Sequence, residues 1–457
     1  MDALPPNSVQ LSPTDEENGV VDVNLDAGAL FVLKSRGSWW HCGYHLTTAI
    51  VSPALLTLPF TLSLLGWFAG LFWLIFACFL TFYSYNLLSV VLEHHAKHGQ
   101  RQLRFRDMAK DILGPRWGKY YVGPLQVALC YGGVVAYTLL GGQILHLVYL
   151  LFNPSGAMKL FNFFIMFGVV VLVLGQIPSF HSLRHINLVS LVLCLAYSVC
   201  VTIGSIYIGN SHKSSSKHYS INGAEQNRIF NALYSISIIA SSYACGVLPE
   251  IQATLAPPVQ GKMLKGLCMC YSVVVFTFFS VAISGYWAFG NQAKGTLLSN
   301  FIDNQKKPIL PTWFLFITYF FTMLQVTAVT VVYLQPSNEI LENKFANPNM
   351  GEYSFRNMLP RLITRSISVV IATVLAAMLP FFGDIMALFG AFACIPLNFI
   401  LPMVFYNVTF KPSKNSVAFW GNTIIAVVST ILAVVGAIAA VRQMFLHAKE
   451  YHLFPNV

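Results

Sequence analysis

Two carboxyl groups, those of Glu250 and Asp384, lie in or beside long apolar segments, where they could carry protons. Six of the 17 acidic residues fall in the first 33 positions, and most of the others fall in polar connections. If the apolar segments cross a bilayer, an ionisable group there is costly to bury and is therefore a functional candidate. Apolar surroundings favour the neutral form of a carboxyl group, so such a group can bind and release a proton. We predict proton coupling at Glu250, with Asp384 as a second candidate.

Both carboxyl groups also have a structural interpretation. Glu250 could be bonded permanently to a neighbouring helix and hold a bundle together. Asp384 follows Phe381-Phe382-Gly383 at the edge of an apolar segment, where a helix N-cap or short-loop role is sufficient. For Asp384 we favour the structural interpretation, and for Glu250 the functional one.

Glu250 belongs to one of two apolar segments that proline and small residues interrupt. Residues 47–60 carry two prolines among small polar residues, and residues 241–252 carry serine, glycine and proline. Proline removes a backbone donor, and inside a membrane the freed groups must be satisfied by protein, water or a ligand. Simple kinks are the alternative, because Pro and Gly are common in membrane helices. Interruptions at matching positions of two halves of a chain favour a transporter binding site built from inverted repeats.

We predict that the two interruptions together bind a zwitterion. The first, from Ser52 to Thr57, offers backbone N–H groups at the start of a half-helix, and these suit a carboxylate. The second, from Ser241 to Gly246, offers free carbonyl groups for an ammonium. The residues predicted to bind the substrate here are Ser52, Pro53, Ala54, Leu55, Thr57, Ser241, Tyr243 and Gly246.

Polar side chains of two further segments could complete this site. They are Tyr131 and Tyr137 in residues 119–152, and Gln325, Thr327 and Thr330 in residues 312–336. The tyrosines could close over the aliphatic part of a substrate, although packing explains them equally well. A sodium ion could use the threonine hydroxyls together with carbonyl groups of the first interruption. The residues alone therefore leave the coupling ion open between proton and sodium.

Apolar helices must position all these residues, and the composition of the chain indicates that such helices are present. Charged residues are 10% of the chain, against about 25% in soluble domains, which excludes an ordinary cytosolic enzyme, a disordered scaffold and a disulfide-stapled secreted domain. A membrane-crossing helix needs about 20 apolar residues. We predict an all-α polytopic membrane protein with eleven such helices, near 42–64, 66–92, 119–152, 158–176, 184–209, 229–252, 264–290, 312–336, 361–380, 383–407 and 417–445.

The basic residues predict the orientation of these helices. With the N-terminus in the cytoplasm, 18 of the 27 Lys and Arg residues fall in cytoplasmic connections, which is the excess that the positive-inside rule requires. We therefore place the N-terminus in the cytoplasm and the C-terminus outside. We predict that these residues face lipid headgroups, with no nucleic-acid partner. The predicted parts are a disordered acidic tail (1–37) and a transmembrane domain (38–457) with repeats at about 42–209 and 229–407 and an additional helix at about 417–445.

Several blocks of the sequence resemble one family of membrane proteins, the amino acid/auxin permeases. The blocks are Ser52-Pro53-Ala54-Leu55-Leu56-Thr57-Leu58-Pro59-Phe60 with Leu65-Gly66-Trp67, Gly246-Val247-Leu248-Pro249-Glu250-Ile251-Gln252-Ala253-Thr254, Phe381-Phe382-Gly383-Asp384, Leu388-Phe389-Gly390-Ala391-Phe392, and Pro396-Leu397-Asn398-Phe399-Ile400-Leu401-Pro402. Many members have Gly-x-Gly where this chain has Ser52-Pro53-Ala54, and that departure is most similar to the plant γ-aminobutyric acid transporter branch. The resemblance implies the amino acid–polyamine–organocation (LeuT-like) fold of five plus five inverted helices with one more, proton-coupled uptake, and a plasma-membrane location.

We therefore predict a proton-coupled importer of a zwitterionic amino acid, γ-aminobutyric acid and related ω-amino acids in particular, that works by alternating access. A broader α-amino acid or auxin permease of the same family is the alternative, and a channel-like protein or receptor is the alternative from another class. No catalytic motif is found, so we predict that the chain is not an enzyme. The nine cysteines form no CxxC pair, and we predict neither a metal site nor a cofactor other than the coupling ion.

Overall fold

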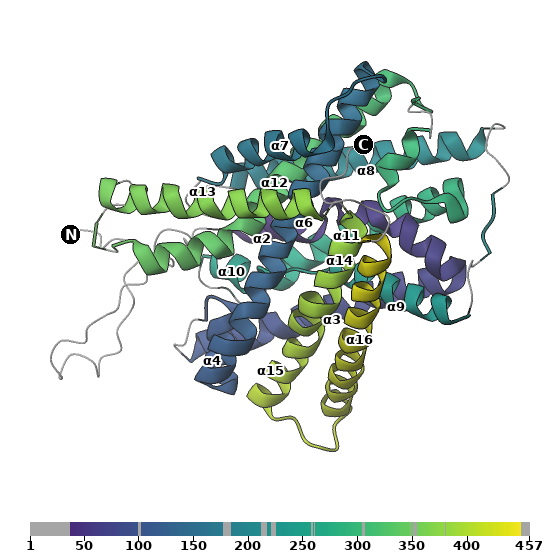
Figure 1. The fold of residues 1–457 in the computed structure, drawn as a ribbon. Coiled ribbons are helices and arrows are strands. Elements are labelled where there is room, and N and C mark those ends of the chain that lie inside the picture. Colours follow the sequence, from purple (N-terminus) through teal and green to yellow (C-terminus); the bar gives the residue numbers. More distant parts are fainter. Residues whose placement is uncertain are drawn as a thin grey trace, which may run out of the picture.

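The described part of the chain is a bundle of long helices joined by short connections (Figure 1). The computed structural model describes residues 37–98, 102–176, 184–211, 217–220, 225–256, 259, 261–303, 307–347, 349–350, 354–379 and 381–448. Residues 1–36 of the predicted acidic tail lie outside the described residues. Within the described residues, β-bridges are isolated and no strand forms.

The helices follow the predicted apolar segments closely. The main elements are α2 (Trp39–Ile50), η1 (Pro53–Thr57), α3 (Leu58–Lys97), α4 (Phe105–Leu113), α5 (Pro115–Trp117), η2 (Gly118–Val122), α6 (Gly123–Phe152), α7 (Leu160–Leu174), α8 (Arg184–Asn210), α9 (Glu225–Ser242), α10 (Leu248–Ala253), α11 (Lys262–Phe289), η4 (Gly290–Gln292), η5 (Leu297–Phe301), α12 (Thr312–Phe345), α13 (Phe355–Met378), α14 (Phe382–Phe389), η6 (Gly390–Cys394), η7 (Pro396–Ile400), α15 (Leu401–Phe410) and α16 (Val417–Ala448).

Length and composition identify 8 helical runs in the described residues that could cross a membrane. One of them, the 59-residue run Trp39–Lys97, contains two crossings, because Gly66 has φ 78° and ψ 172° and ends one helix before the next begins. The 15-residue helix α7 is apolar but short, and α9 with α10 forms one crossing in two pieces. With these three additions, the described residues contain the eleven predicted crossings.

Three features of the helices differ from the sequence prediction. α4 forms inside a basic connection for which no helix was predicted, and its buried face consists of Phe105, Met108 and Ala109. α12 continues through Pro336 to Phe345, and α13 begins at Phe355, so both are longer than the predicted 312–336 and 361–380. The last crossing of the second half contains two π-helical turns, η6 and η7, which hydropathy cannot reveal.

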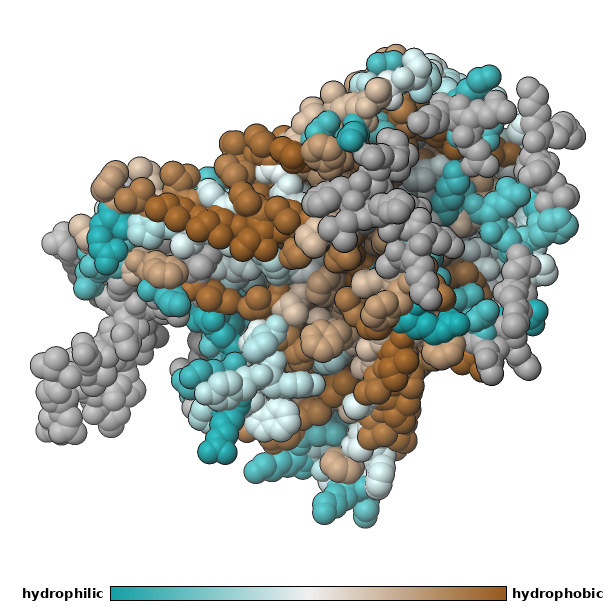
Figure 2. Space-filling model, in the orientation of Figure 1, coloured by the Kyte–Doolittle hydropathy of each residue, from teal (hydrophilic) through white to brown (hydrophobic). Residues whose placement is uncertain are grey.

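The helices divide into an inner set and an outer set. α6 runs through the middle of the bundle and packs against α7, α12, α13 and α14 (Figure 1). α16 lies at the periphery, where Ile424, Val427, Ile431 and Val434 are each more than half exposed. The apolar bands over α13 and α16 in Figure 2 are the surface that a protein presents to lipid chains rather than to water.

Candidate functional site

The first interruption follows from Pro53. Proline lacks an N–H, so the carbonyl of Ala49, four residues earlier, has no helical donor. α2 therefore ends at Ile50, and Val51 and Ser52 leave helical geometry (φ −80°, ψ 69° and φ −94°, ψ 164°) before η1 begins. The carbonyl groups at the end of α2 are thereby open to other donors.

The second interruption lies between Ser242, the last residue of α9, and Leu248, the first of α10. Pro249 fits the first turn of α10, where a missing N–H is tolerated. It cannot donate to the carbonyl of Cys245, four residues before it, so α9 does not continue into α10. Residues 243–247 between the two helices are all buried, and buried carbonyl groups need donors from elsewhere in the protein.

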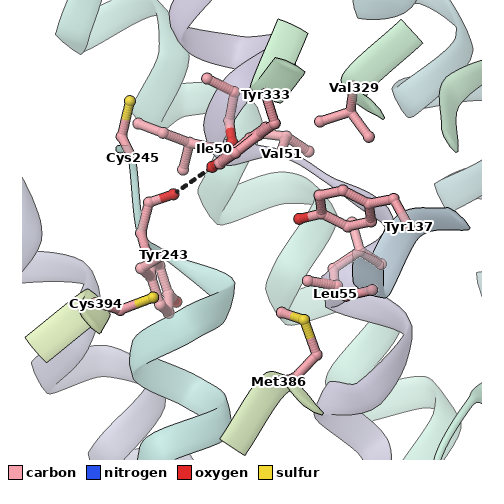
Figure 3. Packing of buried hydrophobic residues seen from close by; sticks show 14 of the residues in the cluster. Ile50, Val51, Leu55, Tyr137, Tyr243, Cys245, Val329, Tyr333, Met386 and Cys394 are labelled. Carbon is pink, nitrogen blue, oxygen red and sulfur yellow. Dashed lines mark hydrogen bonds between the residues drawn. The ribbon is translucent and has the colours of Figure 1, made fainter. Parts of the chain in front are cut away.

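Side chains of α12 supply donors to both interruptions. The hydroxyl of Tyr333 lies 2.9 Å from the carbonyl oxygen of Ala49 and 3.1 Å from that of Ala244, so one side chain bridges the two interruptions. Figure 3 shows Tyr333 with one of its hydrogen bonds as a dashed line. The amide of Gln325 donates to the carbonyl of Val51 at 3.3 Å. The two interruptions therefore face each other across α12, as the prediction of a shared site requires.

α3 and the last crossing of the second half also reach the second interruption. The hydroxyl of Tyr85 donates to the carbonyl of Tyr243 at 2.8 Å and lies 3.1 Å from the side-chain oxygen of Asn398. That oxygen also accepts from the backbone N–H of Cys245 at 3.4 Å. Asn398 is fully buried and lies within the π-turn η7, so this turn places a side-chain amide at the interrupted backbone.

Most predicted substrate residues lie at these interruptions. Pro53, Ala54, Leu55 and Thr57 form the buried turn η1, and the hydroxyl of Tyr137 donates to the Ser52 hydroxyl at 2.7 Å.

In the second interruption the predicted residues contribute mainly backbone. Ser241 turns its hydroxyl back to the carbonyl of Ile238 at 2.8 Å. The side chain of Tyr243 points away from the interruption and donates to the Leu74 carbonyl at 3.1 Å. What these two residues and Gly246 place at the site is therefore main-chain oxygen.

Three predicted side chains lie elsewhere. Tyr131 donates its hydroxyl to the carbonyl of Ser368 in α13, away from both interruptions. Thr327 and Thr330 donate to carbonyl groups one turn earlier in their own helix, at 2.8 Å and 2.6 Å. The structure does not bring these three hydroxyls to the interruptions.

Glu250 lies in the first turn of α10 and is 1% exposed. The side-chain amide of Gln126 in α6 donates to its carboxyl oxygen and to the Gly246 carbonyl, the latter at 3.3 Å. A neutral amide can donate to the carboxylate and to the carboxylic acid alike, so this contact permits both protonation states. Gln126 also lines a cavity of about 240 Å³. The other polar side chains of that cavity wall are Arg104, Arg106 and Lys119.

The prediction that Asp384 caps a helix N-terminus is wrong. The N-cap of α14 is Phe381, and Asp384 lies within the first turn, where a side chain points sideways from the helix. Its carboxylate accepts from the hydroxyl of Tyr234 in α9 and pairs with the ring of His447 in α16, both at 2.7 Å. The buried aspartate therefore joins three helices rather than capping one.

Sequence reasoning missed Tyr333, Gln126 and Asn398. Tyr333 lies eight residues after Gln325 in α12. Eight residues are about 2.2 helical turns, so the two side chains leave the helix within about a quarter turn of each other. Gln126 is an amide in a mostly apolar segment, which was the available signal for it. Asn398 belongs to a block used for the family resemblance but was not assigned to the site.

Comparisons with known proteins agree with this architecture. Residues 35–446 match the family described as "Transmembrane amino acid transporter protein". The chain is 57% identical to GABA transporter 1 of Arabidopsis thaliana over 434 residues, covering 95% of this chain and 96% of that protein. It is 28% identical to Lysine histidine transporter-like 1 of the same plant, over 93% of this chain and 92% of that protein.

Two solved structures share the fold. A Na⁺-coupled sialic acid symporter superimposes with a TM-score of 0.56 and 12% identity, over 95% of this chain and 94% of the symporter. The structure of MhsT in complex with L-phenylalanine superimposes with a TM-score of 0.54 and 11% identity, over 89% of this chain and 99% of MhsT. At such identities the likeness concerns the fold alone, and it confirms the predicted fold class.

Proposed function

The chain belongs to the transmembrane amino acid transporter protein family, and from this premise we propose that it imports γ-aminobutyric acid and related ω-amino acids together with protons. The family membership confirms a multi-pass membrane transporter of amino acids, not an enzyme. The observation that carries the choice of substrate is the 57% identity to GABA transporter 1 across 95% of the chain. The 28% identity to Lysine histidine transporter-like 1 favours a broader α-amino acid permease less strongly.

The two interruptions suit the two ends of a zwitterion. The ammonium binds to carbonyl oxygens, of which Ala49 and Ala244 present one each toward Tyr333. The carboxylate binds at the start of η1, where the first N–H groups of a helix are available to an anion. Both groups of donors and acceptors are buried, so each end of the substrate exchanges water for fixed protein dipoles.

The coupling ion in this proposal is the proton, and Glu250 carries it. Its partner Gln126 permits both protonation states, and the same amide contacts the second interruption through Gly246. Sodium is less suited to the first interruption, where it would need the hydroxyls of Thr327 and Thr330 beside the carbonyl groups of Ala49 and Val51. The hydroxyls of Thr327 and Thr330 point to their own helix and are not directed at those carbonyl groups.

We place this transporter in the plasma membrane, with the N-terminus in the cytoplasm and the C-terminus outside. The basic cavity beside α4 and η2 then lies on the cytoplasmic side, in agreement with the positive-inside rule. Because Gln126 forms part of the cavity wall and also contacts Glu250, a proton released from Glu250 leaves through this cavity.

Glu250→Gln tests the coupling role. A glutamine keeps the size of the side chain but cannot bind and release a proton in this pH range. We expect the variant to reach the membrane, to exchange internal for external γ-aminobutyrate, and to lose accumulation driven by an external acid pH. Radiolabelled uptake at two external pH values, with α-, β- and γ-amino acids as competitors, measures the coupling and the substrate range together.

The matched control is Glu93→Gln at the end of α3. The Glu93 carboxylate accepts from the backbone N–H of Gly261 at 3.2 Å, in a connection outside the helix interruptions. Its replacement should leave uptake and its pH dependence unchanged. Acid-driven accumulation that survives in Glu250→Gln would refute the coupling role of Glu250.

A further inference from the structure

The hydroxyl of Tyr333 is a single donor placed between two acceptors. It lies 2.9 Å from the Ala49 carbonyl and 3.1 Å from the Ala244 carbonyl, and a phenol has one proton to donate. Pro53 removes the helical donor of Ala49, and Ala244 follows the end of α9. Buried carbonyl groups are costly when a donor is lacking. Tyr333 therefore satisfies one of the two carbonyl groups fully at a time.

An alkylammonium ion satisfies this pair of acceptors better than a phenol does. It has three N–H donors, so it can donate to both carbonyl groups at once, and its positive charge strengthens each hydrogen bond. The two carbonyl groups come from the two interruptions that face each other. They therefore form a cation subsite that Tyr333, a neutral side chain, occupies from α12.

We propose that Tyr333 is an internal substitute for the substrate ammonium, and that substrate binding displaces its hydroxyl from the Ala49 and Ala244 carbonyl groups. This inference rests on the proposed transport of an amino acid. It makes Tyr333 a specificity-determining residue, because only a ligand that donates to both carbonyl groups displaces the hydroxyl without loss. A ligand that lacks a protonated amine gains nothing from the exchange.

The occupation of the ammonium subsite by the Tyr333 hydroxyl also has a role in the transport cycle. A symporter must return its site across the membrane without substrate, and two bare carbonyl groups would then be buried without donors. The Tyr333 hydroxyl bridges both interruptions in that step and keeps the two half-sites together. Loss of the hydroxyl should therefore slow the return step but spare exchange, in which the site carries substrate in both directions.

Tyr333→Phe tests the proposal, with Tyr319→Phe as the matched control. Tyr319 is a fully buried tyrosine of the same helix whose hydroxyl donates to the Leu298 carbonyl at 3.3 Å. In Tyr333→Phe the substrate no longer competes with a hydroxyl. We expect γ-aminobutyrate to bind the purified protein about three- to tenfold more tightly, equivalent to one net hydrogen bond. The maximal rate of net uptake should fall several-fold while exchange is preserved. Tyr319→Phe should change neither the affinity for γ-aminobutyrate nor the rate of net uptake.

Weaker binding in Tyr333→Phe, or an equal loss of net uptake and exchange, would show that Tyr333 is a structural tie and would overturn the proposal. If Tyr333→Phe does not fold, fluorotyrosine placed at position 333 keeps the hydroxyl and reports on it by fluorine NMR. The signal should then shift saturably with γ-aminobutyrate, whereas fluorotyrosine at position 319 should not respond. A signal at 333 that ignores bound substrate also overturns the proposal. Failure of the wild-type protein to bind any amino acid would instead refute the proposed function.

Discussion

Two tyrosines of α6 show how position within a helix separates a site residue from a packing residue. Tyr131 and Tyr137 are six residues apart, and at 3.6 residues per turn they point to different sides of the helix. Tyr137 reaches Ser52 at the first interruption, whereas Tyr131 reaches the Ser368 carbonyl in α13. Grouping them by residue type alone, as the sequence analysis did, overlooked this angular separation.

Tyr137→Phe and Tyr131→Phe should therefore differ in transport. Removing the Tyr137 hydroxyl leaves the Ser52 hydroxyl without its donor at the start of η1, so we expect KM for γ-aminobutyrate to rise about three- to tenfold. Tyr131→Phe should leave KM within about twofold of the wild type, because the lost bond lies against α13. Concentration-dependent radiolabelled uptake measures both values. A larger effect of Tyr131→Phe would contradict the placement of the two rings.

Residues that act through their own backbone could be predicted from the sequence, and residues that act through partners could not. Pro53 leaves the Ala49 carbonyl without a helical donor, and this follows from the sequence alone because proline has no N–H. Tyr333 and Gln126 matter because of what they touch 89 or more positions away in the chain, and no local pattern encodes such pairs. The roles of all these residues in binding and coupling stay predictions.

At the scale of elements, long apolar helices and their interruptions were predictable, and short or irregular helices were not. Hydropathy and proline act within about 20 residues, the length of one crossing. α4 escaped prediction because a short amphipathic helix with charged residues resembles a polar connection. The π-turns η6 and η7 depend on how the last crossing packs against α9 and α16, which is a property of the assembled bundle.

Asp384 connects α16 to the second repeat. Asp384 of α14 holds Tyr234 of α9 and His447 of α16, and it is 1% exposed. α9 and α14 belong to the predicted second repeat, whereas α16 is the helix added after it. The carboxylate thus links the additional helix to α9, the first part of the interrupted crossing α9–α10.

The contact between α9 and η6 depends on a glycine. A Cβ at Gly390 would collide with the backbone carbonyl of Ser237, whereas a Cβ at Gly421 in α16 would meet no atom within 4 Å. Gly390→Ala must push the two backbones apart, and we expect a loss of about 1–3 kcal/mol in stability. A thermal unfolding scan of the purified protein in detergent measures this as a lower Tm.

Gly421→Ala is the control for that experiment. The substitution has space, and alanine favours a helix more than glycine does, so its Tm should equal or slightly exceed that of the wild type. An unchanged Tm in Gly390→Ala would show that α9 and η6 do not approach as closely as the structure places them.

For the whole molecule, the shortage of charged residues predicts a lipid-facing surface but not the position of the substrate site. Charged residues are 10% of the chain, and the outer helices α13 and α16 present apolar side chains outward (Figure 2). Composition therefore establishes that the molecule lies in a bilayer. It does not determine which substrate fits between the interruptions, because the spacing of buried carbonyl groups follows from the packing of helices distant in sequence.

The central claim, that Glu250 couples proton entry to the import of γ-aminobutyrate, can be measured directly in proteoliposomes. The purified chain is reconstituted in sodium-free buffer, an inward proton gradient is imposed, and internal radiolabelled γ-aminobutyrate is followed over time. We predict accumulation above the external concentration for the wild type, and equilibration without accumulation for Glu250→Gln. Accumulation that needs a sodium gradient, or a wild-type level that never exceeds the external concentration, would contradict the claim.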